Sequence, residues 1–234
     1  MFNKKRLPEK LPKHIGFILD GNGRWAQKRG LPRNFGHKAG VFAIKNVAKA
    51  LLKYKIPYAS MFCFSTENWK RSKEEVDGIF ELAKNYLKEN IDSLAKSGIK
   101  INFLGDLSVF SDDLKALLYD AMEKTKDNKQ LNLNICLNYG GRLDIVQAVN
   151  KLIKEGKKSI TEKDISDKLY TAGQPDMDLL IRTSGELRIS NFMIYQLAYS
   201  ELYFPKTYWP DFSEKELKKS LMNFGKRKRR YGGY

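Results

Sequence analysis

An aspartate, two glycines and an arginine follow a short apolar run near the start of the chain. The segment His14 to Ala26 has the sequence HIGFILDGNGRWA, in which Asp20 ends the apolar run and Gly21, Gly23 and Arg24 come next. Glycine amides can approach an anion closely, and an arginine can bind one. A carboxylate beside that anion is repelled by it unless a cation such as Mg²⁺ lies between them. The segment therefore predicts metal-assisted diphosphate chemistry.

The same segment has a second interpretation as a dinucleotide site. Gly21, Gly23 and Ala26 match the fingerprint of glycine, any residue, glycine, two more residues and then glycine or alanine. An NAD site also needs an acidic residue about 20 positions later for the ribose hydroxyls. No acidic residue occurs between Asp20 and Glu67, and that interval is rich in lysine and arginine. NAD binding is therefore disfavoured, whereas an NADP-binding oxidoreductase stays open because an arginine can bind the additional phosphate.

The whole chain is strongly basic. Its 234 residues include 43 lysines and arginines against 27 acidic residues, and this net charge of +16 favours nucleic acid, anionic membranes or phosphorylated small molecules as partners. A basic nucleic-acid-binding protein is thus the alternative that is not an enzyme. Cys63 and Cys136 lie in apolar runs, as buried free thiols in a reducing compartment do. No apolar run reaches membrane-spanning or signal-peptide length, so we expect a soluble cytoplasmic protein that can associate with a membrane surface.

Strand-like and helix-like stretches alternate along the chain. Short apolar runs predict six strands, over Ile15–Leu19, Tyr58–Phe64, Ile99–Leu104, Leu131–Leu137, Asp178–Ile181 and Glu201–Phe204. Helical spacing of apolar residues and capping signals predict helices over His37–Tyr54, from Ser72 to Lys96, from Ser111 to Lys126, from Arg142 to Lys154, after Thr161 and after Ser213. Ser72 with Glu75 and Ser213 with Glu216 are the predicted capping boxes.

This alternation indicates an α/β fold. We expect a single domain over 1–234, with a mainly parallel six-stranded sheet surrounded by helices. A polar lead-in (1–13) precedes it, and a basic tail (226–234) ends it. Parallel strands bring the loops at their carboxyl ends together, so Asp20 should meet the segments Ser65–Arg71, Asn138–Arg142 and Arg182–Ser190.

The polar candidates at that edge are mostly cations and hydrogen-bond donors. They are Arg24, Arg33, His37, Arg71, Arg182, Arg188 and Ser190, with the carboxylates Asp20, Glu67 and Glu201. So many arginines suggest a heavily charged ligand, such as two diphosphates. Apolar candidates for a prenyl-binding surface are Phe62, Phe64, Phe80, Tyr86 and Phe103, although each is more commonly a core residue. Arg142 is interpreted as an anchor for its helix.

Five ordered blocks of the chain resemble the cis-prenyltransferase family, in particular the bacterial undecaprenyl diphosphate synthases. The blocks are Asp20–Ala26, Phe35–Gly40, Phe64–Trp69 with Arg71, Asn138–Arg142 and Ile181–Phe204. The resemblance covers nearly the whole chain. It implies a reaction in which isopentenyl diphosphate is condensed repeatedly onto an allylic diphosphate, such as farnesyl diphosphate, to give a long polyprenyl diphosphate, with undecaprenyl diphosphate for the cell-wall lipid carrier as the expected product.

The resemblance also implies roles for particular residues. Asp20 and Glu201 would bind Mg²⁺, and Asp20 and Asn68 would be catalytic. The residues implied for the allylic diphosphate are Gly21, Asn22, Gly23, Arg24, Trp25, Arg33 and His37. Those implied for a mobile loop that orders the substrates are Ser65, Thr66, Glu67, Asn68, Trp69 and Arg71. Those implied for isopentenyl diphosphate are Arg182, Arg188 and Ser190. Ser184 stands where some relatives carry glycine.

Assembly and product handling are further implications of the resemblance. An apolar tunnel would hold the growing prenyl chain. The family is typically dimeric, so we expect a homodimer in which the carboxyl-terminal tail reaches towards the partner's site. The basic run Lys226–Arg230 would then support that site or contact the membrane surface, and no nucleic acid would be involved.

Overall fold

The computed structural model describes residues 7–230 of the chain, and the beginning of the lead-in and the end of the basic tail lie outside them. The strands are β1 (His14–Ile18), β2 (Tyr58–Phe62), β3 (Ile99–Leu104), β4 (Leu131–Cys136), β5 (Leu179–Arg182) and β6 (Glu201–Tyr203). They form one parallel sheet in the order β3-β4-β2-β1-β5-β6. The predicted six-stranded sheet is confirmed, and its pairing is parallel throughout.

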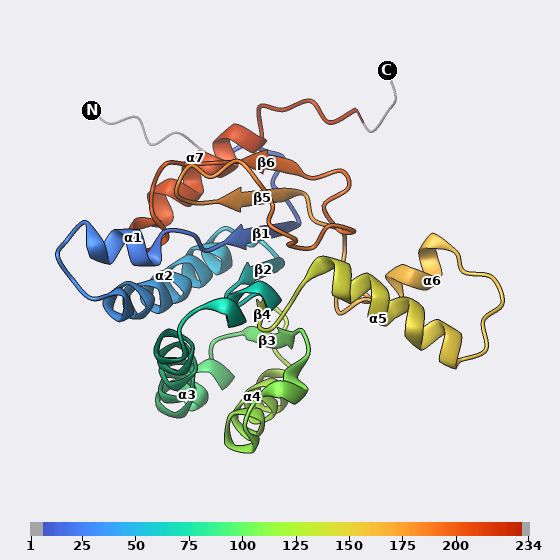
Figure 1. Ribbon diagram of the computed structural model, residues 1–234. Helices are drawn as coiled ribbons and strands as arrows, with labels where there is room; N and C mark the ends of the chain where they lie inside the picture. The colour runs from blue at the N-terminus through green and yellow to red at the C-terminus, as the bar shows by residue number, and fades with distance from the viewer. Residues whose placement is uncertain (1–6, 231–234) are drawn as a thin grey trace.

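Helices surround this sheet (Figure 1). The α-helices are α1 (Asn22–Gln27), α2 (Arg33–Lys53), α3 (Lys73–Ala95), α4 (Asp112–Thr125), α5 (Gly141–Lys154), α6 (Glu162–Ser166) and α7 (Glu214–Phe224). Short 3₁₀ helices are η1 (Thr66–Lys70), η2 (Leu107–Val109) and η3 (Trp209–Asp211). Within residues 7–230, no helix combines the length and apolar character needed to cross a bilayer.

Both faces of the sheet are buried, which explains why its strands are continuous apolar runs. Side chains alternate between the faces along each strand. In β5, Leu179 and Ile181 pack into a cluster with residues of α2 and α7, whereas Leu180 packs on the other face with Phe192 and Met193. Helices on one face and the loop after β5 on the other therefore hold β5, and with it Arg182, in a fixed position.

The strand order opens a crevice at the carboxyl end of β1. This central strand lies between β2 and β5, and the chain builds the β2 side first before it crosses over to β5. Ligands of parallel α/β proteins bind at such a switch point. Asp20 follows β1, and Ile18 pairs with Arg182 at the end of β5, so Asp20 and Arg182 reach the same crevice.

Local predictions needed three corrections. Helix α2 begins at Arg33 instead of His37, because Gly36 packs against α1 and does not break the helix. Ser72 accepts a hydrogen bond from the Glu75 amide at 3.3 Å, but the Glu75 carboxylate turns away to Arg33, His37 and Arg71, so only half of that capping box forms. At Ser213 no side-chain cap forms, and the Glu216 carboxylate pairs with Lys219 instead.

A buried polar network lies within the sheet near its amino end. The His14 side chain is fully buried, with Nδ1 2.8 Å from the Pro175 carbonyl oxygen and Nε2 2.8 Å from Ser60 Oγ. Asn134 donates to Ser60 Oγ at 2.9 Å and to Gln174 Oε1 at 2.7 Å. Because the Pro175 oxygen can only accept, Nδ1 carries the proton and Nε2 is free to accept from Ser60. Burial lowers the pKa of His14 below 6.5, so the imidazole is held neutral.

We therefore expect the free energy of unfolding to fall on acidification through His14. An unfolded His14 binds a proton as the pH drops below 6.5, whereas the folded one resists it, so its contribution is complete above that pH and is lost below it. The limiting slope is about 1.4 kcal/mol per pH unit. Urea unfolding at about pH 7.5 and about pH 5.5 measures it. The His14→Gln variant should lack this part of the pH dependence, and equal pH dependence in both proteins would contradict the assignment.

Candidate active site

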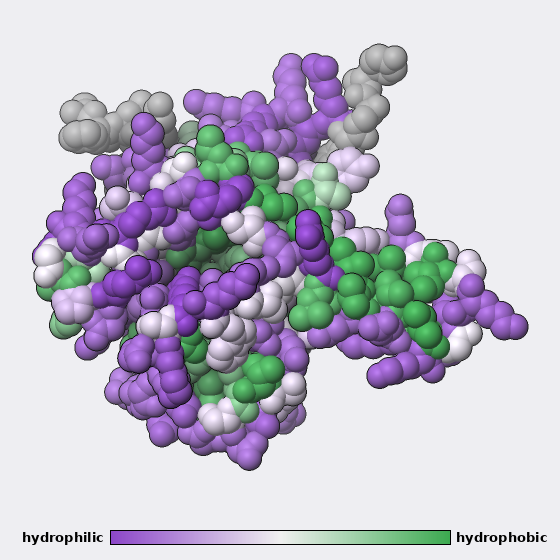
Figure 2. Space-filling view, viewed as in Figure 1, coloured by the Kyte–Doolittle hydropathy of each residue, from purple (hydrophilic) through white to green (hydrophobic). Residues whose placement is uncertain are grey.

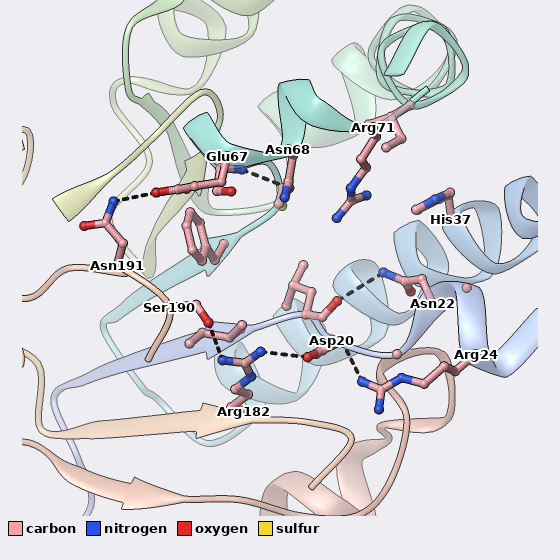
Figure 3. Close-up of a pocket in the computed structure, with 18 of the residues that line it drawn as sticks. Asp20, Asn22, Arg24, His37, Glu67, Asn68, Arg71, Arg182, Ser190 and Asn191 are labelled. Atoms are coloured by element: carbon pink, nitrogen blue, oxygen red, sulfur yellow. Dashed lines mark hydrogen bonds and ion pairs between the residues drawn. The ribbon is translucent and has the colours of Figure 1, made fainter. Parts of the chain in front are cut away.

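A cavity of about 880 Å³ opens at the carboxyl edge of the sheet, and the loops after β1, β2 and β5 line it with residues of α2, α3 and α5 (Figure 3). The structure brings most of the predicted site residues to this cavity. Those that line it are Asp20, Gly21, Asn22, Gly23, Arg24, Arg33, His37, Ser65, Glu67, Asn68, Arg71, Arg182 and Ser190.

The Asp20 carboxylate lies between two arginines (Figure 3). Arg24 Nη2 donates to Oδ1 at 3.0 Å, and Arg182 Nη2 donates to Oδ2 at 2.9 Å. Burial by itself raises the pKa of the Asp20 carboxyl, but the hydrogen bonds and charges of Arg182 and Arg24 outweigh burial and hold the pKa below its ordinary value. Asp20 is therefore ionised at neutral pH, as a cation ligand must be.

Arg182 fastens the loop after β5 to the centre of the site. Its side chain is only 5% exposed. Nη1 donates to the carbonyl oxygen of Arg188 at 2.6 Å and to Ser190 Oγ at 2.7 Å, while Nη2 reaches Asp20. A planar guanidinium offers its donors in fixed directions, so these three bonds set the shape of the loop. Ser190 is thereby held at the cavity wall.

The Arg188 guanidinium itself lies outside the cavity lining. It is 60% exposed and donates to Glu186 at 2.6 Å, and Glu186 also accepts from Arg24 at 2.8 Å. Arg188 thus contributes its carbonyl oxygen to the site, and its charge stays at the rim. Ser184, in the same loop, has a φ of 75°, a conformation that favours glycine.

The Glu75 carboxylate gathers two arginines and a histidine on the opposite side of the cavity. Its carboxylate lies 3.4 Å from Arg33 Nε, 3.2 Å from His37 Nε2 and 3.1 Å from Arg71 Nη1. These three residues come from α2 and the end of η1. Burial, with help from the charges of Arg71 and Arg33, lowers the pKa of His37 although Glu75 opposes the shift. The result is a compact cluster in which two cationic arginines, Arg33 and Arg71, lie beside the neutral imidazole of His37.

The segment from Ser65 to Arg71 forms 3₁₀ helix η1, which Ser65 and Asn68 cap. The Ser65 amide donates to Asn68 Oδ1 at 3.1 Å, so Asn68 shapes the segment as well as lining the cavity. Glu67 accepts from Asn191 Nδ2 at 2.9 Å (Figure 3). This bond ties η1 to the loop that follows β5. The two substrate-facing loops are therefore linked across the cavity.

Besides Arg188, three predicted substrate-binding residues do not line the cavity. Trp25 Nε1 donates to Asp211 at 2.7 Å, and the Arg29 guanidinium stacks on its ring at 4.1 Å. Trp69 Nε1 donates to Asn138 at 2.8 Å, and its ring packs against the core next to η1. Thr66 donates its amide to the Tyr139 carbonyl oxygen at 3.1 Å. In this conformation all three residues make contacts within the fold and do not face the cavity.

Glu201 lies away from Asp20. It is the first residue of β6 and pairs with Leu179 at the amino end of β5, three residues before Arg182, whereas Asp20 lies two residues beyond Ile18, the β1 partner of Arg182. This offset of three residues corresponds to about 10 Å. The Glu201 carboxylate accepts from Arg227 at 2.5 Å. The register of β6 thus places Glu201 towards the other end of the strands from Asp20, and its role as a second metal ligand stays a prediction.

Several lining residues are additional to those predicted. Arg142, interpreted from the sequence as a helix anchor, also lines the cavity; its position after Gly140 and Gly141 at the start of α5 was the available signal. Asn191 follows Ser190 directly in the sequence. The apolar part of the lining is Ile18, Leu19, Phe62, Ile79, Ile189 and Ile194. Phe62 is the one aromatic candidate for the prenyl surface that lines the cavity.

Two glycines let α1 lie directly on α2. A Cβ at Gly36 would lie 2.0 Å from the backbone oxygen of Asn22, and one at Gly40 would lie 2.5 Å from Asn22 Oδ1. Asn22 is the first residue of α1 and lines the cavity beside Asp20. The glycines therefore set the position of the segment that carries Asp20.

We expect Gly36→Ala to lower kcat/KM by about 10²-fold, because moving Asn22 by an ångström also moves the Asp20 carboxylate. Steady-state kinetics measure the effect. Gly78→Ala in α3 is the matched control, since a Cβ there meets nothing within 4 Å and alanine favours helix. Normal kinetics in the Gly36 variant would show that this contact does not position the site.

These features define a class of protein. A parallel α/β fold holds one ionised aspartate between arginines at its switch point, next to a second cationic cluster and an apolar wall, and this arrangement suits ligands with two anionic groups and an apolar part. The family described as putative undecaprenyl diphosphate synthase has a model that matches residues 18–232. The chain belongs to this family.

Individual relatives agree over nearly their whole length. The chain is 47% identical over 233 residues to the isoprenyl transferase of Clostridium perfringens, covering 97% of this chain and 92% of that protein. It is 48% identical over 229 residues to the ditrans,polycis-undecaprenyl-diphosphate synthase ((2E,6E)-farnesyl-diphosphate specific) of Legionella pneumophila, covering 95% and 96%.

Solved structures share the fold. The lavandulyl diphosphate synthase of Lavandula x intermedia, in complex with dimethylallyl diphosphate, has a TM-score of 0.91 and 31% identity over 95% of this chain and 98% of that one. A probable undecaprenyl diphosphate synthase of Campylobacter jejuni has a TM-score of 0.81 and 31% identity over 96% and 100%. The dinucleotide and nucleic-acid alternatives gain no support from these relatives.

Proposed function

We propose that the protein condenses isopentenyl diphosphate repeatedly onto an allylic diphosphate, with farnesyl diphosphate as the primer, to give a long cis-polyprenyl diphosphate such as undecaprenyl diphosphate. The observation that carries this proposal is the pair of cationic clusters in one cavity, with Arg33, His37 and Arg71 on one side of Asp20 and Arg182 on the other. Family membership and the name of the Legionella relative support the choice of substrates.

The chemistry follows from these positions. The bond between C1 and oxygen of the allylic substrate breaks, and its diphosphate leaves with the electron pair. The isopentenyl double bond attacks C1, a carbon–carbon bond forms, and a proton lost from the isopentenyl unit gives the new double bond. Arg33 and His37 stabilise the charge that grows on the departing diphosphate, because fixed donors act strongly in a partly enclosed site. Arg182 and Ser190 hold the isopentenyl diphosphate, and Asn68 orders the reacting groups between them.

Asp20 suits Mg²⁺ as a single protein carboxylate. Among residues 7–230 no three His, Cys, Asp or Glu side chains gather into a metal cage. Mg²⁺ is commonly held by one or two carboxylates together with substrate phosphates, which matches one aspartate in a diphosphate site. Asp20 would hold the ion jointly with diphosphate oxygens. When bound, Mg²⁺ neutralises the charge of the diphosphate as it leaves.

We therefore expect Mg²⁺ to bind tightly only together with a diphosphate. Isothermal titration calorimetry with Mg²⁺ should give a weak signal for the protein alone and a clear one when inorganic pyrophosphate is present, because the phosphate oxygens complete the coordination. Excess EDTA should abolish turnover, and added Mg²⁺ should restore it. The Asp20→Asn variant is the control, and tight Mg²⁺ binding without pyrophosphate would contradict a site built around one carboxylate.

We propose that the protein is a homodimer joined through α5. Leu143, Val146 and Ile153 on this helix are 37%, 52% and 59% exposed, and they form part of a broad apolar surface over α5 (Figure 2). Contiguous apolar surface of this kind marks an interface in a soluble protein. Sedimentation of a Val146→Asp, Ile153→Asp variant should give a monomer where the wild type gives a dimer.

We propose that the basic tail stabilises its own chain by packing against it. Arg227 donates to Glu201 at 2.5 Å and to the Leu202 carbonyl oxygen at 2.9 Å, and Arg229 pairs with Asp178. These contacts hold residues 226–230 against the amino end of β5 and β6. A reach into a partner's site would fall to residues 231–234, which lie outside the described residues. Cytoplasmic location and contact with a membrane surface remain part of the proposal.

The test of this function is transfer of labelled isopentenyl units into a lipid that partitions into butanol. Transfer should require farnesyl diphosphate, isopentenyl diphosphate and Mg²⁺ together. Retention of label in the aqueous phase under all conditions, with and without detergent, would overturn the proposal. The length of an apolar tunnel beyond the cavity stays a prediction, which the size of the product measures.

A further inference from the structure

The outward side of α2 combines exposed aromatic side chains with lysines. Phe35 is 51% exposed and Phe42 is 57% exposed, and Leu31, just before the helix, is 37% exposed. These three residues and the lysines at positions 38, 45 and 49 follow one another at intervals of three or four residues, which places them on one side of the helix. The lysine–phenylalanine face consists of Leu31, Phe35, Lys38, Phe42, Lys45 and Lys49.

The lysines of this face have no counter-ions. The side chains of Lys38, Lys45 and Lys49 form no ion pair or hydrogen bond within the part of the chain that the structure describes, and α2 contains no acidic residue. Lys53, by contrast, pairs with Glu214 at 2.7 Å. Unpaired positive charge around exposed aromatic rings is complementary to a surface that is anionic outside and apolar beneath.

The same helix lines the cavity with its inner side. Arg33 and His37 stand on either side of Phe35 in the sequence, and both line the cavity. The lysine–phenylalanine face therefore begins within one helical turn of the proposed allylic diphosphate site. Helices α1 and α2 form one edge of the molecule, at the left of Figure 1. A surface docked on this edge would lie close to the place where a long apolar product is made, and this step rests on the proposed function.

Two other surfaces fit a bilayer less well. On α5, Asn150 lies between the exposed Val146 and Ile153 where α2 has lysine, and this apolar stripe is assigned above to a second copy of the chain. In the basic tail, Arg227 and Arg229 are already engaged by Glu201 and Asp178. The lysine–phenylalanine face combines unpaired charge with exposed apolar area, as neither of these does.

We propose that the lysine–phenylalanine face of α2 docks the protein on the surface of anionic phospholipid bilayers. The lysines contact the lipid headgroups, and Phe35 and Phe42 enter the interface between headgroups and acyl chains. The headgroup attraction is electrostatic, so binding weakens as the salt concentration rises. The orientation places the start of α2, and with it one wall of the cavity, against the membrane.

Co-sedimentation with vesicles tests this proposal without any substrate. The full-length protein should bind vesicles that contain phosphatidylglycerol more tightly than vesicles of phosphatidylcholine alone. Each lysine near an anionic surface adds about fivefold, so Lys38→Ser, Lys45→Ser, Lys49→Ser should weaken binding to the anionic vesicles by about 100-fold. The Phe35→Ser, Phe42→Ser variant should also bind less tightly and should keep some preference for anionic lipid.

The matched control removes the same charge elsewhere. Lys129, Lys154 and Lys158 are exposed and lack ion pairs in the described chain, and replacing all three with serine should leave vesicle binding within about threefold of the wild type. Equal losses in the two triple variants would overturn the proposal, because net charge alone would then explain binding. Retention of vesicle binding by the α2 variant, or binding of RNA in place of vesicles through the same lysines, would overturn it too.

Turnover separates this proposal from the proposed function. In detergent solution the Lys38, Lys45, Lys49 variant should transfer isopentenyl units at the wild-type rate, since none of these lysines lines the cavity. A wild-type protein that binds anionic vesicles through α2 but transfers no units would refute the function alone. A protein that transfers units normally and ignores anionic vesicles would refute the docking surface alone.

Discussion

In the Asp20→Ala variant we expect the rate of condensation to fall by about 10³-fold or more. Asp20 is the carboxylate between the two cationic clusters, and its oxygens are bonded to Arg24 and Arg182. Its removal eliminates the proposed Mg²⁺ ligand and leaves two diphosphates to be neutralised by arginines alone. Single-turnover measurements with farnesyl diphosphate and isopentenyl diphosphate report the chemical step directly.

Stability must be measured beside activity in this variant. Arg182 is almost completely buried, and removing its carboxylate partner leaves it with only the Arg188 oxygen and Ser190. An unbalanced buried charge is destabilising by several kcal/mol in unfavourable cases. Asp20→Asn is the control, because the amide keeps the size of the side chain and an oxygen that accepts from arginine. A folded Asp20→Asn protein with activity near that of the wild type would contradict the role assigned to Asp20.

For Arg182→Lys we expect kcat/KM for isopentenyl diphosphate to fall by about 10²-fold or more, with little change in the affinity for the allylic substrate. Lysine keeps the positive charge but has no planar fork, so it cannot bond to Asp20, the Arg188 oxygen and Ser190 together. The loop after β5 would lose its shape. The loss therefore measures geometry and not charge.

The opposite selectivity is expected on the other side of the cavity. Arg33→Lys should lower kcat/KM for the allylic substrate more than kcat/KM for isopentenyl diphosphate, because Arg33 belongs to the cluster around Glu75. Steady-state kinetics with each substrate varied in turn give both values. Equal losses for both substrates in both variants would indicate that the two clusters do not form separate diphosphate sites.

The architecture could be predicted from the sequence because its strands are buried on both faces. Each appears as a short apolar run, and for β3 the predicted and observed bounds coincide at Ile99–Leu104. The first turn of α2 could not be predicted, since Gly36 and Pro32 resemble a turn in isolation. Its helical backbone depends on the contact between Gly36 and Asn22 in another helix. Tertiary packing outweighs local propensity there.

The residues of the site were more predictable than their partners. Asp20 and Arg182 follow apolar runs that end at one edge of the sheet, and parallel pairing brings them together. The local sequence around Glu75 favours a capping box with Ser72, but Arg71 and two residues of α2, Arg33 and His37, bind its carboxylate instead. The position of Glu201 relative to Asp20 could not be predicted either, because packing fixes the register between β5 and β6 and the local sequence does not indicate it.

The measurement that tests the central claim most directly is the structure of the product made from farnesyl diphosphate and isopentenyl diphosphate with Mg²⁺. We predict a polyprenyl chain many units longer than the primer, in which ¹³C NMR finds every newly formed double bond in the cis configuration. A product with trans double bonds in the added units, or no elongation with and without detergent, would contradict the account of this site.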